Sequence, residues 1–374
     1  MSANAAASNP LTERISHSVN VFDDGEPQHA PASARMVSTT IRSDVLVIDV
    51  HAHIGLSQGL DEMRRIHPDG TPRLVDRDGG HYFEYPTGVV NGPLPPGMVD
   101  LDRRIFDMDE AGVDLQVVSV RPQMFGHSID PKMAARLAAT QNEALLDTVA
   151  RRSDRIHAMI SLPLMDPKAS VDEIRRSASN PLVRGVLLDS NIGGANLDED
   201  RFDPIWTALS DTDMPILVHP YQADVAGMDR MMRYYLFNLI GNPLDSTIAL
   251  ASVVFGGVLD RFPALRWCFV HGGGYAPYQL ARWDHGWRVR AEARVHLDEP
   301  PSSRFGRLYF DSLTHSPAPL RMLAELVGWS QVMVGTDYPF DMGDSDPVAS
   351  IDRLDLEEAA RRGVLESNAR RFLR

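Results

Sequence analysis

The feature that most restricts the fold of this 374-residue sequence is a regular alternation of short apolar runs with stretches of helix length. The runs are rich in β-branched residues and lack polar alternation, which is typical of strands buried on both faces of a parallel sheet. The expected strands are residues 45–53, 113–120, 156–162, 185–188, 215–219, 265–271, 308–313 and 331–335. The expected helices are residues 99–112, 131–153, 168–179, 203–211, 244–262, 275–295 and 317–328, followed by a helical tail at 346–374. Eight such units predict a (β/α)8 TIM barrel.

A doubly wound open sheet is the alternative fold for this alternation. That fold usually carries a glycine-rich phosphate loop after its first strand, but here the position holds His-Ala-His-Ile-Gly, residues 51–55. We therefore predict a single barrel domain over residues 44–374. Residues 54–97, rich in Gly, Pro and Asp, are expected to form an insertion or lid after the first strand, and residues 1–43 a flexible N-terminal arm.

Composition excludes several classes of function. The formal net charge of −14 argues against a nucleic-acid partner, because nothing would offset repulsion from phosphates. We find no apolar run of membrane-span length and no secretory leader, so we expect a cytoplasmic protein without a membrane partner. The single cysteine, Cys268, rules out an intrachain disulfide and lies in an apolar run.

Titratable residues stand at the ends of four expected strands. The first strand ends in His51 and His53, whose i, i+2 spacing directs both imidazoles to one face. His219 and His271 end the fifth and sixth strands, and Asp337 follows the eighth. Carboxyl ends of barrel strands meet at one face, where barrel enzymes carry their chemistry. Three imidazoles and a carboxylate suit one divalent metal ion with an open position for water.

The metal count follows from the fourth strand. Barrels of this type that hold two metals usually bridge them with a carboxylated lysine there, and this chain has only Lys132 and Lys168, both away from strand ends. We therefore predict one metal ion, which leaves His271 free to act as an acid or base.

Several motifs resemble those of one known family. They are Asp-Val-His-Ala-His at 49–53, Val-His-Pro at 218–220, Phe-Val-His-Gly-Gly-Gly at 269–274 and Gly-Thr-Asp-Tyr-Pro-Phe at 335–340. Further similarity lies at 233–257, 282–286 and 309–315. Over residues 44–374 the chain resembles the amidohydrolase superfamily, and within it the branch of 2-amino-3-carboxymuconate-6-semialdehyde decarboxylase.

This resemblance implies a function for each strand-end residue. His51, His53, His219 and Asp337 would be metal ligands, and His271 would activate a metal-bound water. Zinc is the usual metal in that branch, while related aromatic decarboxylases often use manganese. The resemblance also implies a homodimer.

The chain departs from the family pattern in its arginines. The family places a catalytic arginine in the insertion, but residues 86–93 contain none. Arg121, just past the second strand, is a candidate replacement. Arg282 stands where the family draws a substrate-binding arginine across the dimer interface, and Arg290 is a second candidate; alternatively, Arg282 pairs with Asp284 on its own subunit.

Two reactions remain open at this stage. The resemblance predicts a metal-dependent, non-oxidative decarboxylase acting on a small unsaturated or aromatic carboxylate, which an arginine would bind in bidentate geometry. The alternative is a mononuclear metal-dependent hydrolase of a lactone, amide or related carbonyl compound, in which Asp337 takes the proton.

Overall fold

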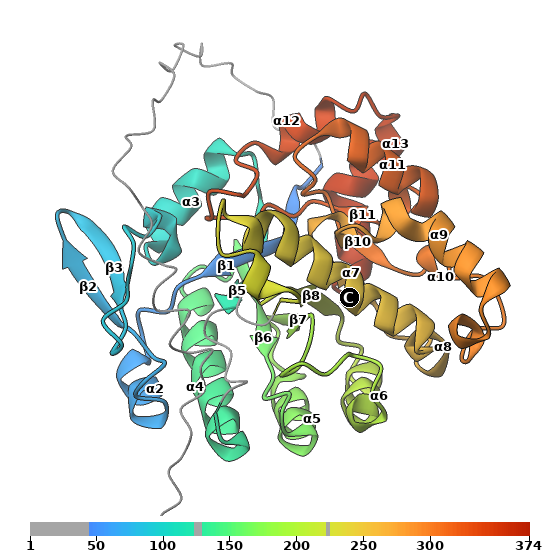
Figure 1. Ribbon diagram of the computed structural model, residues 1–374. Helices are drawn as coiled ribbons and strands as arrows, with labels where there is room; N and C mark the ends of the chain where they lie inside the picture. The colour runs from blue at the N-terminus through green and yellow to red at the C-terminus, as the bar shows by residue number, and fades with distance from the viewer. Residues whose placement is uncertain (1–44, 123–128, 222–224) are drawn as a thin grey trace, which may run out of the picture.

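The structure is a computed structural model that describes residues 45–122, 129–221 and 225–374, so the predicted arm at 1–43 lies outside the described residues. Eight parallel strands form one sheet, and Figure 1 shows the helices arranged around it. The strands are β1 (Ile48–Ile54), β5 (Leu115–Val120), β6 (Ile156–Ser161), β7 (Val183–Asp189), β8 (Ile216–His219), β9 (Trp267–Phe269), β10 (Tyr309–Asp311) and β11 (Val332–Met333).

The first and last strands join, which closes the sheet into a barrel. The backbone N–H of Val50 donates to the carbonyl of Val334, and Ala52 forms a parallel bridge with Tyr338. The predicted (β/α)8 barrel is therefore confirmed.

The helices follow the predicted order, with boundaries set by local residues. They are α3 (Leu101–Glu110), α4 (Pro131–Ala150), α5 (Pro167–Ser177), α6 (Asp203–Asp211), α7 (Asn242–Phe255), α8 (Val258–Arg261), α9 (Ala276–Val289), α10 (Ser302–Phe305) and α11 (Pro317–Val327). Helices α3, α4 and α5 each begin after an aspartate whose side chain accepts backbone N–H bonds. The expected helix at 244–262 is divided because Gly257 takes a left-handed conformation, with φ of 68°.

The insertion after β1 contains more regular structure than its composition predicts. It forms helix α2 (Leu60–Ile66) and an antiparallel sheet of β2 (Arg73–Arg77), β3 (Gly80–Glu84) and β4 (Val90–Asn91). Figure 1 shows the β2–β3 hairpin projecting from the side of the barrel. Phe83 of β3 and Met98 are buried, so the base of the insertion packs on the domain.

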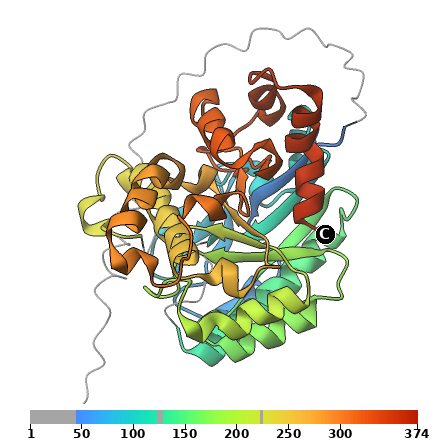
Figure 2. The ribbon, with the colours of Figure 1, turned by 90° about the vertical axis from the view of Figure 1, so that its right-hand side faces the viewer.

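Two apolar layers hold the barrel together. The outer layer lies between the strands and the helices, and the inner layer fills the barrel. The tail forms α12 (Pro347–Asp352), α13 (Glu358–Arg362) and α14 (Asn368–Phe372), which Figure 2 shows together at one side of the sheet. Ala369 and Phe372 of α14 join the inner layer beside Ile48, so the tail closes one end of the barrel, as expected. None of the helices in the described ranges combines the length and hydropathy that crossing a bilayer requires.

Candidate metal centre and active site

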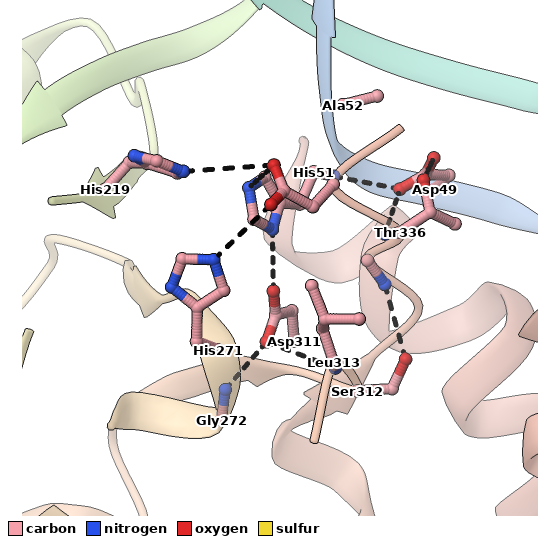
Figure 3. A network of polar contacts seen from close by, with 12 residues as sticks. Asp49, His51, Ala52, His219, His271, Gly272, Asp311, Ser312, Leu313 and Thr336 are labelled. Atoms are coloured by element: carbon pink, nitrogen blue, oxygen red, sulfur yellow. Dashed lines mark hydrogen bonds and ion pairs between the residues drawn. The ribbon is translucent and has the colours of Figure 1, made fainter. Parts of the chain in front are cut away.

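Four predicted residues meet at the carboxyl end of the barrel. One ligand atom from each of His51, His53, His219 and Asp337 lies within 4.8 Å of the other three, and all four residues are buried. His53 Nε2 lies 3.1 Å from Asp337 Oδ1, and His51 Nε2 lies 3.4 Å from the same oxygen. Figure 3 shows the imidazoles of His51, His219 and His271 directed toward one small region.

A β-bulge in β1 brings both of its histidines to this region. The register between β1 and β5 shifts between Asp49 and Ala52, which inserts one residue into β1. Ile48 and Val50 face the barrel interior before the bulge. After it, the inward set moves to odd positions, because Ala52 and Ile54 belong to the outer layer. His51 and His53 can thus both face the interior.

Each imidazole of the cluster contacts a protein oxygen through its Nδ1. His219 Nδ1 lies 2.8 Å from the Pro220 carbonyl, to which it must donate. His53 Nδ1 lies 3.1 Å from Ser119 Oγ. His51 Nδ1 lies 2.7 Å from Asp311 Oδ2. When Nδ1 donates such a bond in the neutral imidazole, the lone pair lies on Nε2, the form that binds metals.

Asp311, at the end of β10, was missed by the sequence analysis. It is fully buried, and besides contacting His51 it accepts a bond from the backbone N–H of Gly272 at 2.8 Å, as Figure 3 shows. Gly335 must be a glycine beside it, because a Cβ there would lie 2.6 Å from Asp311 Cβ and 2.9 Å from His51 Cβ. In the sequence, Asp311 lies inside the strand expected at 308–313, and a charged residue at such a position was the available signal.

A second network of buried hydrogen bonds surrounds Asp49 of β1. Asp49 accepts bonds from the Gln116 side chain at 2.8 Å and from the Thr336 hydroxyl at 2.6 Å. Gln116 in turn accepts from Arg104, whose guanidinium also donates to the carbonyl of His53. Burial lowers the pKa of Arg104 to about 10. The network ties β1, β5, α3 and the chain before Asp337 into one unit.

The charges at the cluster also favour a cation. Burial alone would lower the pKa of His51, but the carboxylates of Asp337 and Asp311 outweigh it and raise the pKa to about 10. Burial would raise the pKa of Asp337, yet the surrounding histidines hold it well below its usual range. Burial, followed by the neighbouring imidazoles, lowers the pKa of His219 well below its ordinary value. The Asp337 carboxylate lies against three imidazoles, those of His51, His53 and His219.

The donor set fits one divalent ion. His219 Nε2 is buried without a hydrogen-bond partner among the described residues, and it faces Asp337 Oδ1 at 4.0 Å. An ion bound by three imidazoles and a carboxylate would satisfy this nitrogen. Residues 45–122, 129–221 and 225–374 contain no other such cluster of His, Cys, Asp and Glu side chains.

His271 lies beside this cluster and outside it. Its Nε2 is 3.8 Å from Asp337 Oδ2, and its side chain is 16% exposed. His271 and Asp337 both have a φ of 56°, a left-handed conformation that is costly for residues with a Cβ. Strain at these two positions is consistent with a functional requirement for their placement.

A small cavity opens onto His271 and Asp337. Its volume is about 280 Å³, and its wall is formed largely by apolar residues of α7, α9, α11 and adjoining loops. Ligand sites for drug-sized molecules usually measure about 300–1,000 Å³. This cavity suits a small molecule of about one ring.

The three candidate arginines have different surroundings. Arg121 is buried against the insertion: its guanidinium lies 5.1 Å from the centre of the Phe83 ring, and two of its nitrogens lack a partner among the described residues. Arg282 is exposed on α9 and makes no ion pair within the described part of the chain, whereas Asp284 accepts from the backbone of Ser302. Arg290 is exposed and pairs with Glu292 at 2.8 Å.

Comparison with known proteins identifies the family. The amidohydrolase family profile matches residues 48–374, so the chain belongs to the amidohydrolase family. The chain is 34% identical over 276 residues to 2-amino-3-carboxymuconate-6-semialdehyde decarboxylase of Dictyostelium discoideum, covering 73% of this chain and 76% of the relative. It is 28% identical over 369 residues to the protein of the same name from Caenorhabditis elegans, covering 83% and 91%. The predicted resemblance is confirmed.

A solved structure shares the fold. The crystal structure of 5-carboxyvanillate decarboxylase from Novosphingobium aromaticivorans, complexed with manganese and 4-hydroxy-3-methoxy-5-nitrobenzoic acid, matches with a TM-score of 0.73. The two sequences are 23% identical, and the match covers 88% of this chain and 96% of the other.

Proposed function

We propose that this protein is a metal-dependent, non-oxidative decarboxylase of a small unsaturated or aromatic carboxylate, acting in the cytoplasm. One observation carries the proposal: a buried cluster of three histidines and an aspartate lies beside His271 at the edge of a cavity of about 280 Å³. The two relatives named as decarboxylases, one of them 34% identical, support the reaction type.

The proposed metal ligands are His51, His53, His219 and Asp337. Zinc is our first assignment, from the resemblance to the decarboxylase branch, and manganese is the second because it is bound in the structural neighbour described above. When bound, a divalent ion would polarise substrate oxygens and stabilise negative charge that develops during the reaction.

His271 and Asp337 are the proposed proton-transfer residues. Decarboxylation breaks the bond between the carboxylate carbon and its neighbour, so carbon dioxide leaves and a proton replaces it on that neighbouring carbon. His271 Nε2 reaches the cavity and lies 3.8 Å from Asp337 Oδ2, so this pair can supply the proton and recover one from solvent.

Arginines are proposed to bind the negative end of the substrate. Arg121 fits this role because it is a buried cation with two unpartnered nitrogens, next to the insertion that lacks the family arginine. Burial lowers the pKa of Arg121, and a substrate anion beside the guanidinium would stabilise its charged form. We propose that Arg282 on α9 and Arg290, the residue after this helix, also bind the negative end of the substrate.

A homodimer would explain the surface around α9. Tyr278 of α9 is 75% exposed, which is high for an aromatic residue. Tyr278 and Arg282 are four residues apart and lie on one face of the helix. We propose that this face packs on a second copy and carries Arg282 to the partner's pocket.

A mixture of two inactive variants tests this arrangement. In a hybrid of His271→Ala and Arg282→Ala chains, one pocket receives both defects and the other neither, so activity returns. If Arg282 acts within its own chain, every hybrid pocket keeps one defect and activity stays low. A monomer in sedimentation analysis would contradict the dimer directly.

Product analysis distinguishes decarboxylation from the alternative hydrolysis. Metal-loaded protein is incubated with monocyclic carboxylates, including 2,6-dihydroxybenzoate, and separately with lactones and amides of similar size. We expect one carbon dioxide released per molecule of product, and a loss of this release in metal-free protein. Hydrolysis of a lactone or amide without carbon dioxide release from any carboxylate would favour the hydrolase.

A further inference from the structure

The wall of the cavity contains a polar side chain that the proposed chemistry does not use. Asn242 lines the cavity together with His271 and Asp337. The residue is only 6% exposed, and its Oδ1 has no hydrogen-bond partner among the described residues. Buried amide oxygens are almost always paired, so an unpaired one beside a catalytic pocket needs a physical reason.

Helix capping does not supply that reason. The N-cap position of α7 is Gly241, and Asn242 follows it as the first residue of the helix. An asparagine caps a helix from the N-cap position, and here a glycine without a side chain occupies that position. The preceding turn, Phe237–Gly241, is π-helical and continues directly into α7. The side chain of Asn242 therefore has no structural hydrogen bond to make at its own helix terminus.

The packing of the neighbouring loop brings Asn242 to the same wall as His271. The three glycines after His271 all have positive φ, and a Cβ on Gly274 would lie 2.1 Å from the carbonyl oxygen of Pro243. The loop thus approaches the start of α7 more closely than any other residue type allows. Asn242 and the candidate acid/base residue consequently face one cavity.

We propose that Asn242 determines substrate specificity by accepting a hydrogen bond from a hydroxyl or amino substituent of the substrate. This inference rests on the proposed function and extends it, since it adds a donor group to the required carboxylate. A ring without the substituent leaves the buried oxygen unpaired and binds more weakly. A methoxy group in place of the hydroxyl lacks the donor and fails in the same way.

Ser246 provides a matched control on the same helix. It lies four residues further along α7, is fully buried, and also has an Oγ without a partner among the described residues. It is not one of the residues that line the cavity. Ser246→Ala therefore removes an equally buried, equally unpaired oxygen without changing the wall.

The test measures ligand binding, so it does not depend on turnover. Manganese-loaded wild type, Asn242→Leu, Asn242→Ala and Ser246→Ala are titrated by calorimetry with benzoate, the three monohydroxybenzoates and their methoxy counterparts. We expect wild type and Ser246→Ala to bind at least one hydroxybenzoate roughly tenfold more tightly than benzoate and the matching methoxy compound. Both Asn242 variants should keep their metal and lose most of this preference.

Each alternative result overturns a defined part of the inference. Wild-type binding of benzoate and every hydroxybenzoate with equal affinity would refute it without reference to any variant. If Asn242→Leu and Asn242→Ala still prefer the hydroxybenzoates, a residue other than Asn242 accepts the hydrogen bond from the substrate hydroxyl. If no probe binds the loaded wild type, the proposed action on aromatic carboxylates fails as well, and the inference fails with it.

Discussion

The proposed metal cluster and the cavity wall beside it differ in what holds their polar side chains in place. In the cluster, His51, His53 and His219 each have their second ring nitrogen in contact with a protein oxygen. On the cavity wall, the buried Oδ1 of Asn242 lacks a partner among the described residues. The cluster is therefore preorganised for an ion by the fold alone. We propose that Asn242 gains its hydrogen-bond partner when a substrate binds.

The largest expected effect comes from removing a proposed metal ligand from the cluster. Purified wild type should carry about one divalent ion per chain, and His51→Ala should carry none and lose activity, because three remaining ligands hold the ion poorly. Elemental analysis measures both proteins. Two ions per wild-type chain, or full occupancy in the variant, would contradict a single site at these residues.

His271 lies beside the cluster and lines the cavity, and its replacement should remove catalysis without removing the metal ion. We expect His271→Ala to retain its ion and to lose about two to four orders of magnitude in kcat, the usual contribution of a general acid or base. Metal content and steady-state rates are measured on the same preparation. Loss of the ion together with activity would instead make His271 a ligand.

The charge on His51 predicts how metal affinity depends on pH. The pKa of about 10 in the metal-free protein means that a proton must leave His51 before an ion binds. Affinity should therefore increase with pH, by about 100-fold between pH 6 and pH 8 for one displaced proton. By the same linkage, the stability that this raised pKa gives the metal-free protein is complete below about pH 6.5 and is lost as pH rises through about 10. Titrations that show pH-independent affinity over this range would contradict the assignment.

Asp311 should have a smaller effect, because it orients a ligand without being one. We expect Asp311→Asn to weaken metal binding by about 10- to 100-fold, a usual cost of losing a carboxylate that supports a metal-bound histidine. Competition with a chelator measures the change. An unchanged affinity would mean that the bonds of Asp311 to His51 and Gly272 hold the loop and do not influence the ion.

The sequence was most informative where chemistry coincides with strand ends. His219 and Asp337 follow apolar runs, so barrel topology alone predicts that they converge. The position of His51 relative to Val50 was not predictable, because it depends on a β-bulge that no residue pattern marks. Asp311 ends the observed strand β10 but lay inside the longer strand expected at 308–313, so only its contact with His51 reveals its role.

The substrate side was less predictable from sequence for a physical reason. Its residues come from loops and helix starts, whose positions depend on packing between distant segments. Asn242 reaches the cavity because Gly274 packs against Pro243, a contact that joins two separate parts of the chain. The insertion forms a small sheet that its content of glycine and proline did not predict.

Anomalous diffraction from crystals of the manganese-loaded protein would show most directly which residues bind the metal ion. We expect one manganese peak per chain, bonded to His51, His53, His219 and Asp337, with His271 close by and not bonded. A second peak in the barrel, or a coordination shell that includes His271 and omits one of the four, would contradict it.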